Sequence, residues 1–160
     1  MAPKSVKKSN SILLLLLPFL FLSTACSPEY GSYANMQQID KTGWQRLCAY
    51  SCEAPVYDSL SFYRIDVTGR LRYSCRLDSL SVIVQVTAPA GESFRDTLSF
   101  ALAHLNDRIW KDFRFPWCSH VQFLEKGTWQ FSFWHNMDID VLTGVTAIGV
   151  YIEKEGDGKK

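Results

Sequence analysis

The sequence lacks an excess of charge of either sign, since 17 Lys and Arg residues stand against 16 Asp and Glu residues. Three of the basic residues precede residue 26, so the rest of the chain carries 14 basic and 16 acidic residues, a net charge near −2. A protein that binds nucleic acid needs a surplus of Lys and Arg to neutralise phosphates. The composition therefore predicts no nucleic-acid partner and gives no attraction to an anionic surface.

The motifs of common catalytic and metal sites are also missing. No serine stands in the Gly-flanked turn GxSxG of many hydrolases. No paired CxxC accompanies the three histidines, His104, His120 and His135. His135, Asp138 and Asp140 form an HxxDxD pattern, but two carboxylates between strands are more typical of a solvated turn than of a metal site. We expect no catalytic residues, no metal and no cofactor.

Beyond residue 26 the sequence has no long hydrophobic run, because charged residues interrupt every apolar stretch. The run that does occur, Ile12–Leu22, has eleven residues, fewer than the about 20 that cross a bilayer. It follows three lysines and ends just before three small residues and Cys26. This order predicts a lipoprotein signal peptide over residues 1–25.

Cys26 is the predicted lipidation site. Lipoprotein signals usually carry Leu three residues before the modified cysteine, whereas here Leu22 stands four residues before it and Ser23 takes the expected place. A secreted protein that is cut near Ala25 and keeps Cys26 as a thiol is therefore the alternative. Several acyl chains on Cys26 would give a stable anchor, because each buried methylene contributes about 0.8 kcal/mol.

The segments after the signal peptide differ in composition. Residues 26–42 are polar and rich in Ser, Gln and Gly, which predicts a flexible, lipid-anchored tether. Residues 43–153 are long enough for one domain with a hydrophobic core. The charged end, residues 154–160, is predicted to be a disordered tail. We expect one soluble domain held at the membrane by its amino-terminal end.

Four cysteines remain when the lipidation site is set aside, and their even number in an exported chain allows one or two disulfides. They are Cys48, Cys52, Cys75 and Cys118. On one strand Cys48 and Cys52 would lie about 13 Å apart, beyond the roughly 7 Å limit for bridged Cα atoms, so each would pair with one of the other two. Four unpaired thiols are the alternative.

Alternating polar and apolar residues over most of the mature chain predict half-buried strands. Thr68 and Gly69 are expected to turn the chain, residues 53–55 to end a strand, and Pro116 to mark an edge strand or a loop. The predicted strands are Trp44–Cys52, Leu60–Val67, Arg70–Cys75, Leu80–Val86, Asp96–Ala103, Val121–Leu124, Thr128–His135 and Val145–Glu153.

Two of these strands show the clearest alternation. Tyr63, Ile65 and Val67 share one face of their strand, and the apolar residues of Leu80–Val86 share one face of theirs. Seven or eight short antiparallel strands with regular turns predict an all-β fold. We expect an antiparallel β-sandwich of jelly-roll type, with a β-barrel as the second architecture.

The candidate binding residues are aromatic. One segment alternates aromatic side chains with Arg and Lys, and such residues stack on sugars or dock partners at interfaces. Its aromatic members are Trp110, Phe113, Phe115 and Trp117. Trp134 stands on the otherwise polar face of its predicted strand and suggests a second platform. The alternative is that these side chains fill the core and cover a sheet edge.

A set of short motifs spans residues 40–153. The motifs are Trp44; Leu71 and Arg72; the strand LSVIVQV; Pro89 and Gly91; Asp96 to Phe100; Leu102, Ala103, Asp107 and Trp110; Gly127, Trp129 and Phe131; and Met137, Leu142, Gly144, Val145, Gly149, Val150 and Ile152. In an exported lipoprotein of this length, the set resembles the gliding-motility lipoprotein family of the GldH type.

The chain departs from the pattern of that family in two loops, where binding function usually lies. After Arg72 it has the shorter segment YSCRLDS in place of a tyrosine-rich loop. Around Trp110, the residues Arg108, Lys111 and Asp112 replace expected glycines.

The resemblance implies a lipid-anchored component of the cell envelope that is linked to gliding motility and its associated protein secretion, with no known catalysis. It implies an outer-membrane location facing the periplasm and other envelope proteins as partners. Members also occur in bacteria that do not glide.

Three hypotheses follow for the function. The leading one is a non-catalytic scaffold that binds other envelope proteins through an exposed aromatic patch. The alternative is a glycan-binding lipoprotein with a planar groove lined by Trp110, Trp117 or Trp134. The third, an envelope hydrolase, needs convergent acids or a triad in a cleft.

Overall fold

The computed structural model describes residues 31–109 and 111–155, which contain ten strands and a short 3-10 helix (Ala103–Leu105). The strands are β1 (Ser32–Gln38), β2 (Trp44–Gln45), β3 (Tyr50–Val56), β4 (Phe62–Leu71), β5 (Ser79–Thr87), β6 (Ser93–Ala101), β7 (Asp112–Gln122), β8 (Gly127–His135), β9 (Val141–Leu142) and β10 (Val145–Lys154).

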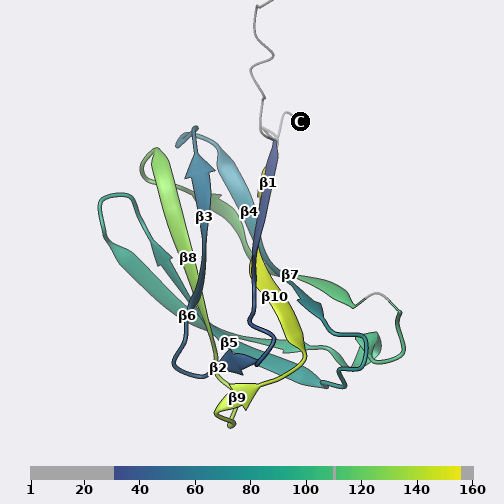
Figure 1. Ribbon diagram of the computed structural model, residues 1–160. Helices are drawn as coiled ribbons and strands as arrows, with labels where there is room; N and C mark the ends of the chain where they lie inside the picture. The colour runs from purple at the N-terminus through teal and green to yellow at the C-terminus, as the bar shows by residue number, and fades with distance from the viewer. Residues whose placement is uncertain (1–30, 110, 156–160) are drawn as a thin grey trace, which may run out of the picture.

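Eight of the strands form two antiparallel four-stranded sheets that pack face to face (Figure 1). The strand order is β1-β10-β4-β7 in sheet I and β3-β8-β5-β6 in sheet II, and β2 pairs with β9. Each strand of the first half pairs with one of the second: β1 with β10, β3 with β8, β4 with β7 and β5 with β6. A long hairpin rolled into two sheets in this way is a jelly roll. The predicted β-sandwich of jelly-roll type is confirmed.

The core lies between the two sheets, because alternate side chains of each strand point inward. Leu80, Val82 and Val84 of β5 are fully buried, as are Phe131 and Phe133 on the neighbouring strand β8. Burial of one such side chain contributes about 1.5–3 kcal/mol to folding. On β4, the predicted apolar face is likewise buried, and it consists of Tyr63, Ile65 and Val67.

The predicted tether is wrong for residues 32–38, which form β1 at the edge of sheet I. Most side chains of β1 are exposed, so the strand is held by its main-chain ladder with β10, in which Ser32 pairs with Glu153. Ile39 follows β1, is buried, and donates its N–H to the Thr146 carbonyl over 2.9 Å. The folded domain therefore begins by Ser32 and not at residue 43.

Three predicted segments lie wholly or partly outside the described residues. They are the signal peptide (1–25), the first part of the tether with the lipidation site Cys26, and residues 156–160 of the tail.

The predicted strand Trp44–Cys52 is interrupted. The Trp44 indole Nε1 donates to the Cys48 carbonyl over 3.0 Å and closes a turn between β2 and β3. Pro55, expected near the end of this strand, lies inside β3 and pairs with Thr128. A proline is tolerated there because β3 is an edge strand of sheet II, where an N–H on the outer side needs no ladder partner.

Thr68 and Gly69 do not turn the chain, because β4 continues through them to Leu71. Gly69 is needed for packing: a Cβ there would overlap the ring of Phe113 on β7 and lie 2.7 Å from the Ala147 carbonyl oxygen. The predicted separate strand Arg70–Cys75 is therefore wrong, and residues 72–78 form a loop.

The two ends of the sandwich carry different loops (Figure 1, top and bottom). At the proximal end β1 begins, β10 ends, and the connections 57–61 and 123–126 join β3 to β4 and β7 to β8. At the distal end lie the connections 46–49, 72–78 and 136–140. The β6–β7 connection, of which residues 102–109 and 111 are described, lies there too.

Candidate functional site

Two loops of the distal end, 46–49 and 136–140, are joined to each other. The Arg46 N–H donates to the Asp140 carbonyl over 2.8 Å, and the Arg46 guanidinium lies 3.8 Å from the Asp138 carboxylate. This backbone bond continues the short ladder between β2 and β9. Leu47 and Ile139, one from each loop, are exposed on the joined pair.

The other two distal loops, 72–78 and the β6–β7 connection, form a second joined pair. The Leu77 N–H donates to the Asn106 side chain over 3.2 Å, and Arg76 pairs with Asp107 at 3.3 Å. Lys111 is almost fully buried and donates to the Cys75 carbonyl over 2.6 Å.

A contact at Gly144 connects the two loop pairs. The Gly144 carbonyl, just after β9, accepts a 2.6 Å hydrogen bond from the Arg72 N–H. Gly144 has a φ of +96°, and a Cβ there would overlap the Cys75 thiol. Burial raises the pKa of that thiol. The second loop pair is therefore tied to the turn between β9 and β10, and β9 links that turn to the 136–140 loop of the first pair.

This distal surface presents four large exposed apolar side chains, which we call the distal apolar set: Leu47, Tyr73, Ile109 and Ile139. Exposed groups of apolar residues rimmed by polar ones often mark protein interaction sites. The rim here contains both signs of charge, including the two ion pairs described above. The surface suits a partner that buries apolar side chains between polar contacts.

A buried histidine supports the distal surface from below. His135, at the end of β8, is 1% exposed and packs edge-on against Trp44, with ring centroids 5.7 Å apart. Burial lowers its pKa. Its neighbours in the HxxDxD pattern, Asp138 and Asp140, are exposed, so the three side chains do not converge. In the described part of the chain, no group of three or more His, Cys, Asp or Glu could hold a metal ion.

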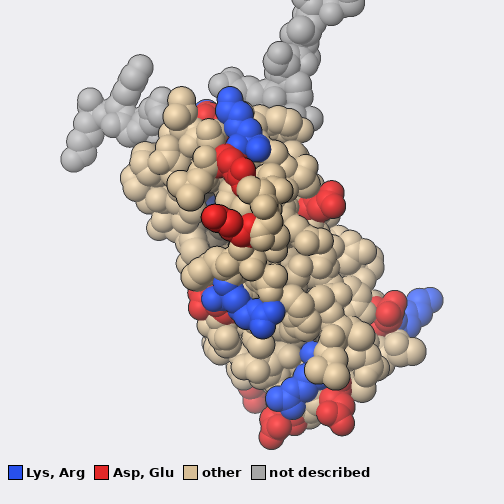
Figure 2. Space-filling view, turned by 90° about the vertical axis from the view of Figure 1, so that its left-hand side faces the viewer, with Lys and Arg blue, Asp and Glu red and all other residues tan. Residues whose placement is uncertain are grey.

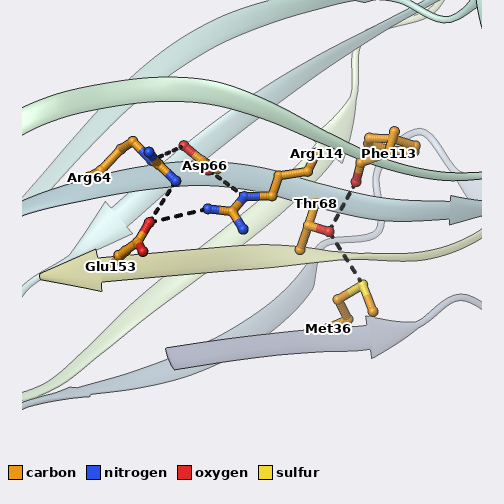
Figure 3. Close-up of polar contacts among 7 residues, drawn as sticks. All are labelled: Met36, Arg64, Asp66, Thr68, Phe113, Arg114 and Glu153. Atoms are coloured by element: carbon orange, nitrogen blue, oxygen red, sulfur yellow. Dashed lines mark hydrogen bonds and ion pairs between the residues drawn. The ribbon is translucent and has the colours of Figure 1, made fainter. Parts of the chain in front are cut away.

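The outer face of sheet I carries a charge network (Figure 3). The Asp66 carboxylate accepts from Arg114 Nε and lies 3.4 Å from Arg64 Nε. Both arginines also reach Glu153, at 2.6 Å from Arg64 and 3.6 Å from Arg114. The Arg114 guanidinium lies 3.3 Å from the centroid of the Tyr151 ring. The two arginines and two carboxylates balance in charge, so the network offers no surplus charge to a ligand, although Arg64 Nε and Asp66 Oδ1 are buried without a hydrogen bond.

The outer face of sheet II is mostly uncharged, and on the side that Figure 2 shows, charged side chains stand in small separate groups. Trp134 lies on this face, with the Arg95 guanidinium 5.1 Å from its ring centroid. Arg95 also donates to the Gln85 side chain over 2.7 Å. The residues of β3, β5 and β8 that share this face are mainly Ser, Thr and Gln, among them Ser51, Gln85, Thr87, Thr128, Gln130 and Ser132.

The aromatic residues predicted for binding do not form one surface. Phe113 is buried against Gly69, so its prediction as a contact residue is wrong. Phe115 and Trp117, also on β7, are partly buried. Phe115 stacks on Phe100 of sheet II at 4.8 Å, and the Trp117 indole donates to Asp96 over 3.0 Å.

These two aromatic residues therefore join the edges of the sandwich. Trp134 lies on the outer face of the other sheet. Trp110 lies outside the described residues.

The four cysteines of the domain are free thiols in the structure. Cys48 is exposed and Cys52 is buried, whereas Cys75 and Cys118 are partly buried. Burial raises the pKa of Cys52 to about 11. Among the described residues, no helix is long and apolar enough to cross a membrane.

The sequence pattern did not predict the distal apolar set. Leu47 and Ile139 are single apolar residues between polar neighbours, a weak signal shared by many loop positions. Their grouping depends on which loops pair across the end of the sandwich.

One of the matches among solved structures is to a viral protein. A chain of the crystal structure of the infectious bursal disease virus VP2 subviral particle matches with a TM-score of 0.38 and 11% sequence identity. The match covers 76% of this chain and 30% of the viral chain, so this chain spans less than a third of that one. No curated protein matches the sequence.

A family model assigns the chain. It matches residues 31–152, which contain β1 to β9 in full and β10 without its last two residues. The match begins one residue before β1 and reaches into β10, so it covers nearly the whole folded domain. The chain therefore belongs to the GldH lipoprotein family.

Proposed function

We propose that this protein is a lipid-anchored, non-catalytic component of the cell envelope that acts by binding other envelope proteins through its distal end. Its family membership makes it a lipoprotein associated with gliding motility. The proposal adds Cys26 as the lipidated residue, the periplasmic side of the outer membrane as the location, and the distal apolar set as the contact.

The observation that carries the proposal is the exposure of four large apolar side chains on loops that are fixed to one another. Exposed apolar groups on rigid loops bind with little loss of conformational freedom, because the loops are already ordered. The ties at Arg46, Leu77 and Gly144 provide that order. The partner is a protein with its own apolar patch at this site.

The chemistry of the distal end also favours contact over catalysis. His135 is buried beneath the loops, Asp138 is exposed and near Arg46, and Lys111 is bound to a carbonyl. A catalytic acid and base must both reach one reacting atom. Each of these side chains contacts a different neighbour: His135 packs on Trp44, Asp138 lies near Arg46, and Lys111 donates to the Cys75 carbonyl. They contribute to the packing of the loops.

A second candidate function, glycan binding, is favoured by the outer face of sheet II. Hydroxyl and amide side chains surround Trp134 there, and an aromatic ring beside such groups can stack on a sugar. Arg95 lies over this ring, so a glycan would have to displace it or stack beside it.

A pull-down from crosslinked membranes tests the two functions together. The double variant Leu47→Asp with Tyr73→Asp places charge in the distal apolar set and is expected to lose a protein partner that the parent captures. Ser99→Asp, at an exposed position on β6, is the matched control and is expected to keep it. Recovery of no protein partner by the parent, with retention on a polysaccharide column that Trp134→Ala abolishes, would support the glycan function instead.

A further inference from the structure

The proximal end carries a second group of exposed apolar side chains, formed by loops that the strand register brings together. Val56 at the end of β3 pairs with Gly127, and Phe62 at the start of β4 pairs with Gln122. The Gln122 amide donates to the Leu60 carbonyl over 3.2 Å. The β3–β4 and β7–β8 loops therefore lie side by side.

The most exposed residues of these loops are leucines. Leu124 is 87% exposed and Leu60 is 81% exposed, and the aromatic side chains of Tyr57 and Phe62 are exposed beside them. We call these four residues the proximal apolar set. Large apolar side chains at loop tips cost free energy in water unless a second surface covers them.

The backbone under this set is well ordered. The Leu60 N–H donates to the Asp58 carboxylate over 2.9 Å, and the Tyr63 hydroxyl donates to the Asp58 carbonyl over 2.7 Å. The Ser61 hydroxyl, which donates to the same carboxylate, contributes most to holding the pKa of Asp58 below its ordinary value. The charged carboxylate pairs with Lys154 at 2.9 Å, which ties the loop to the end of β10.

The anchor must lie close to this end of the molecule. β1 begins at Ser32, beside the end of β10, and only five residues separate Ser32 from Cys26. Six steps of fully extended chain reach at most about 20 Å. A lipid on Cys26 therefore keeps the proximal end near the bilayer surface and not at the end of a long tether.

We propose that the proximal apolar set rests in the interface of the phospholipid bilayer and holds the sandwich upright, with its distal end directed away from the membrane. This inference rests on the proposed lipid anchor at Cys26. The bilayer is the occupant because the anchor places it at this end, whereas β2 and β9, which flank the loops of Leu47 and Ile139, lie at the opposite end of the sandwich (Figure 1).

The charges of the proximal end fit a contact that is apolar and not electrostatic. Asp58 pairs with Lys154, and Glu155 pairs with His120 at 3.1 Å. Glu125 accepts from the Ala90 N–H over 3.0 Å. Because the described residues of this end show no surplus of Lys and Arg, the contact they make does not depend on anionic lipids, whose attraction requires clustered Lys and Arg.

Photo-crosslinking from each end of the lipidated protein tests the inference. The photoreactive residue p-benzoylphenylalanine replaces Leu60 or Leu124 at the proximal end, and Leu47 or Ile139 at the distal end as matched controls. The purified lipidated protein is reconstituted in neutral vesicles of phosphatidylcholine and phosphatidylethanolamine. Mass spectrometry then measures adducts with lipid after irradiation.

We expect a several-fold excess of lipid adducts at positions 60 and 124 over positions 47 and 139, unchanged when salt is raised. Equal yields at both ends, or no adducts at 60 and 124 in protein whose Cys26 is acylated, would overturn the inference and leave the anchor intact. An unmodified Cys26 in protein from native membranes would instead overturn the proposed anchor. Crosslinks from 60 and 124 to a protein in intact membranes, without lipid adducts, would also overturn the bilayer contact.

Discussion

Arg114 donates from Nε to the carboxylate of Asp66, although both residues belong to the outer face of a sheet. The Asp66 side chain is only 3% exposed, because the two arginines of the network and the Tyr151 ring lie around it. A carboxylate in this position needs its partners, since water cannot replace them.

Asp66→Asn is therefore expected to lower the free energy of unfolding by about 2 kcal/mol. Removing one partner of a fully buried pair costs about 3–5 kcal/mol, and partial exposure of Arg64 and Arg114 reduces that cost here. Urea denaturation gives the measurement. The control is Asp112→Asn, which breaks an exposed pair with Arg70 and should have little effect. Equal losses in the two variants would contradict the structural role of the network.

The buried His135 predicts a pH dependence of stability. Because burial lowers its folded-state pKa, the unfolded chain binds more protons than the folded chain below the ordinary histidine pKa of about 6.5. Stability should therefore fall as the pH decreases from 7 to 5, and His135→Phe should reduce this slope. His104→Gln, at an exposed position, is the control. An unchanged slope in His135→Phe, measured by urea denaturation at several pH values, would refute the prediction.

The cysteines should react in an order set by exposure. At pH 8 iodoacetamide is expected to modify Cys48 first and Cys52 only after unfolding, because the Cys52 thiol is buried and its pKa is about 11. Peptide mass spectrometry identifies the modified sites. If Cys48 reacts only after reduction, it forms a disulfide and the free-thiol structure is wrong at that position.

Gly69 predicts a steric effect of a single methyl group. Gly69→Ala should destabilise the domain by about 1–3 kcal/mol, because the new Cβ meets the Phe113 ring and the Ala147 carbonyl. Gly31→Ala, where no atom lies within 4 Å of the added Cβ, is the control and should be nearly neutral. Thermal unfolding compares the two, and a neutral Gly69→Ala would contradict the close packing of β4 on β7.

The fold was largely predictable because its central strands repeat with a period of two. Leu80, Val82 and Val84 recur at every second position and share one face of β5, and the structure buries them as expected. β1 was not predictable in this way, because its polar side chains are mostly exposed and main-chain bonds to β10 hold it. Gly69 suggested a turn, whereas its partner Phe113, 44 positions later, requires a glycine inside a strand.

The candidate site was less predictable than the fold. The alternation of aromatic and charged residues in β7 suggested a surface, but alternation also buries every second residue, and Phe113 is among those. The distal apolar set depends on contacts between residues far apart in sequence, such as Arg46 with Asp140 and Arg72 with Gly144. No local pattern contains that information.

In-cell photo-crosslinking from the distal end tests the account most directly. The same photoreactive residue at Leu47, Tyr73 or Ile139 is introduced into the protein in its native bacterium, with position Ser99 as the control. The account predicts discrete crosslinked products that contain another envelope protein from the distal positions and none from the control. Products from the control position alone, or no protein product from any distal position, would contradict it.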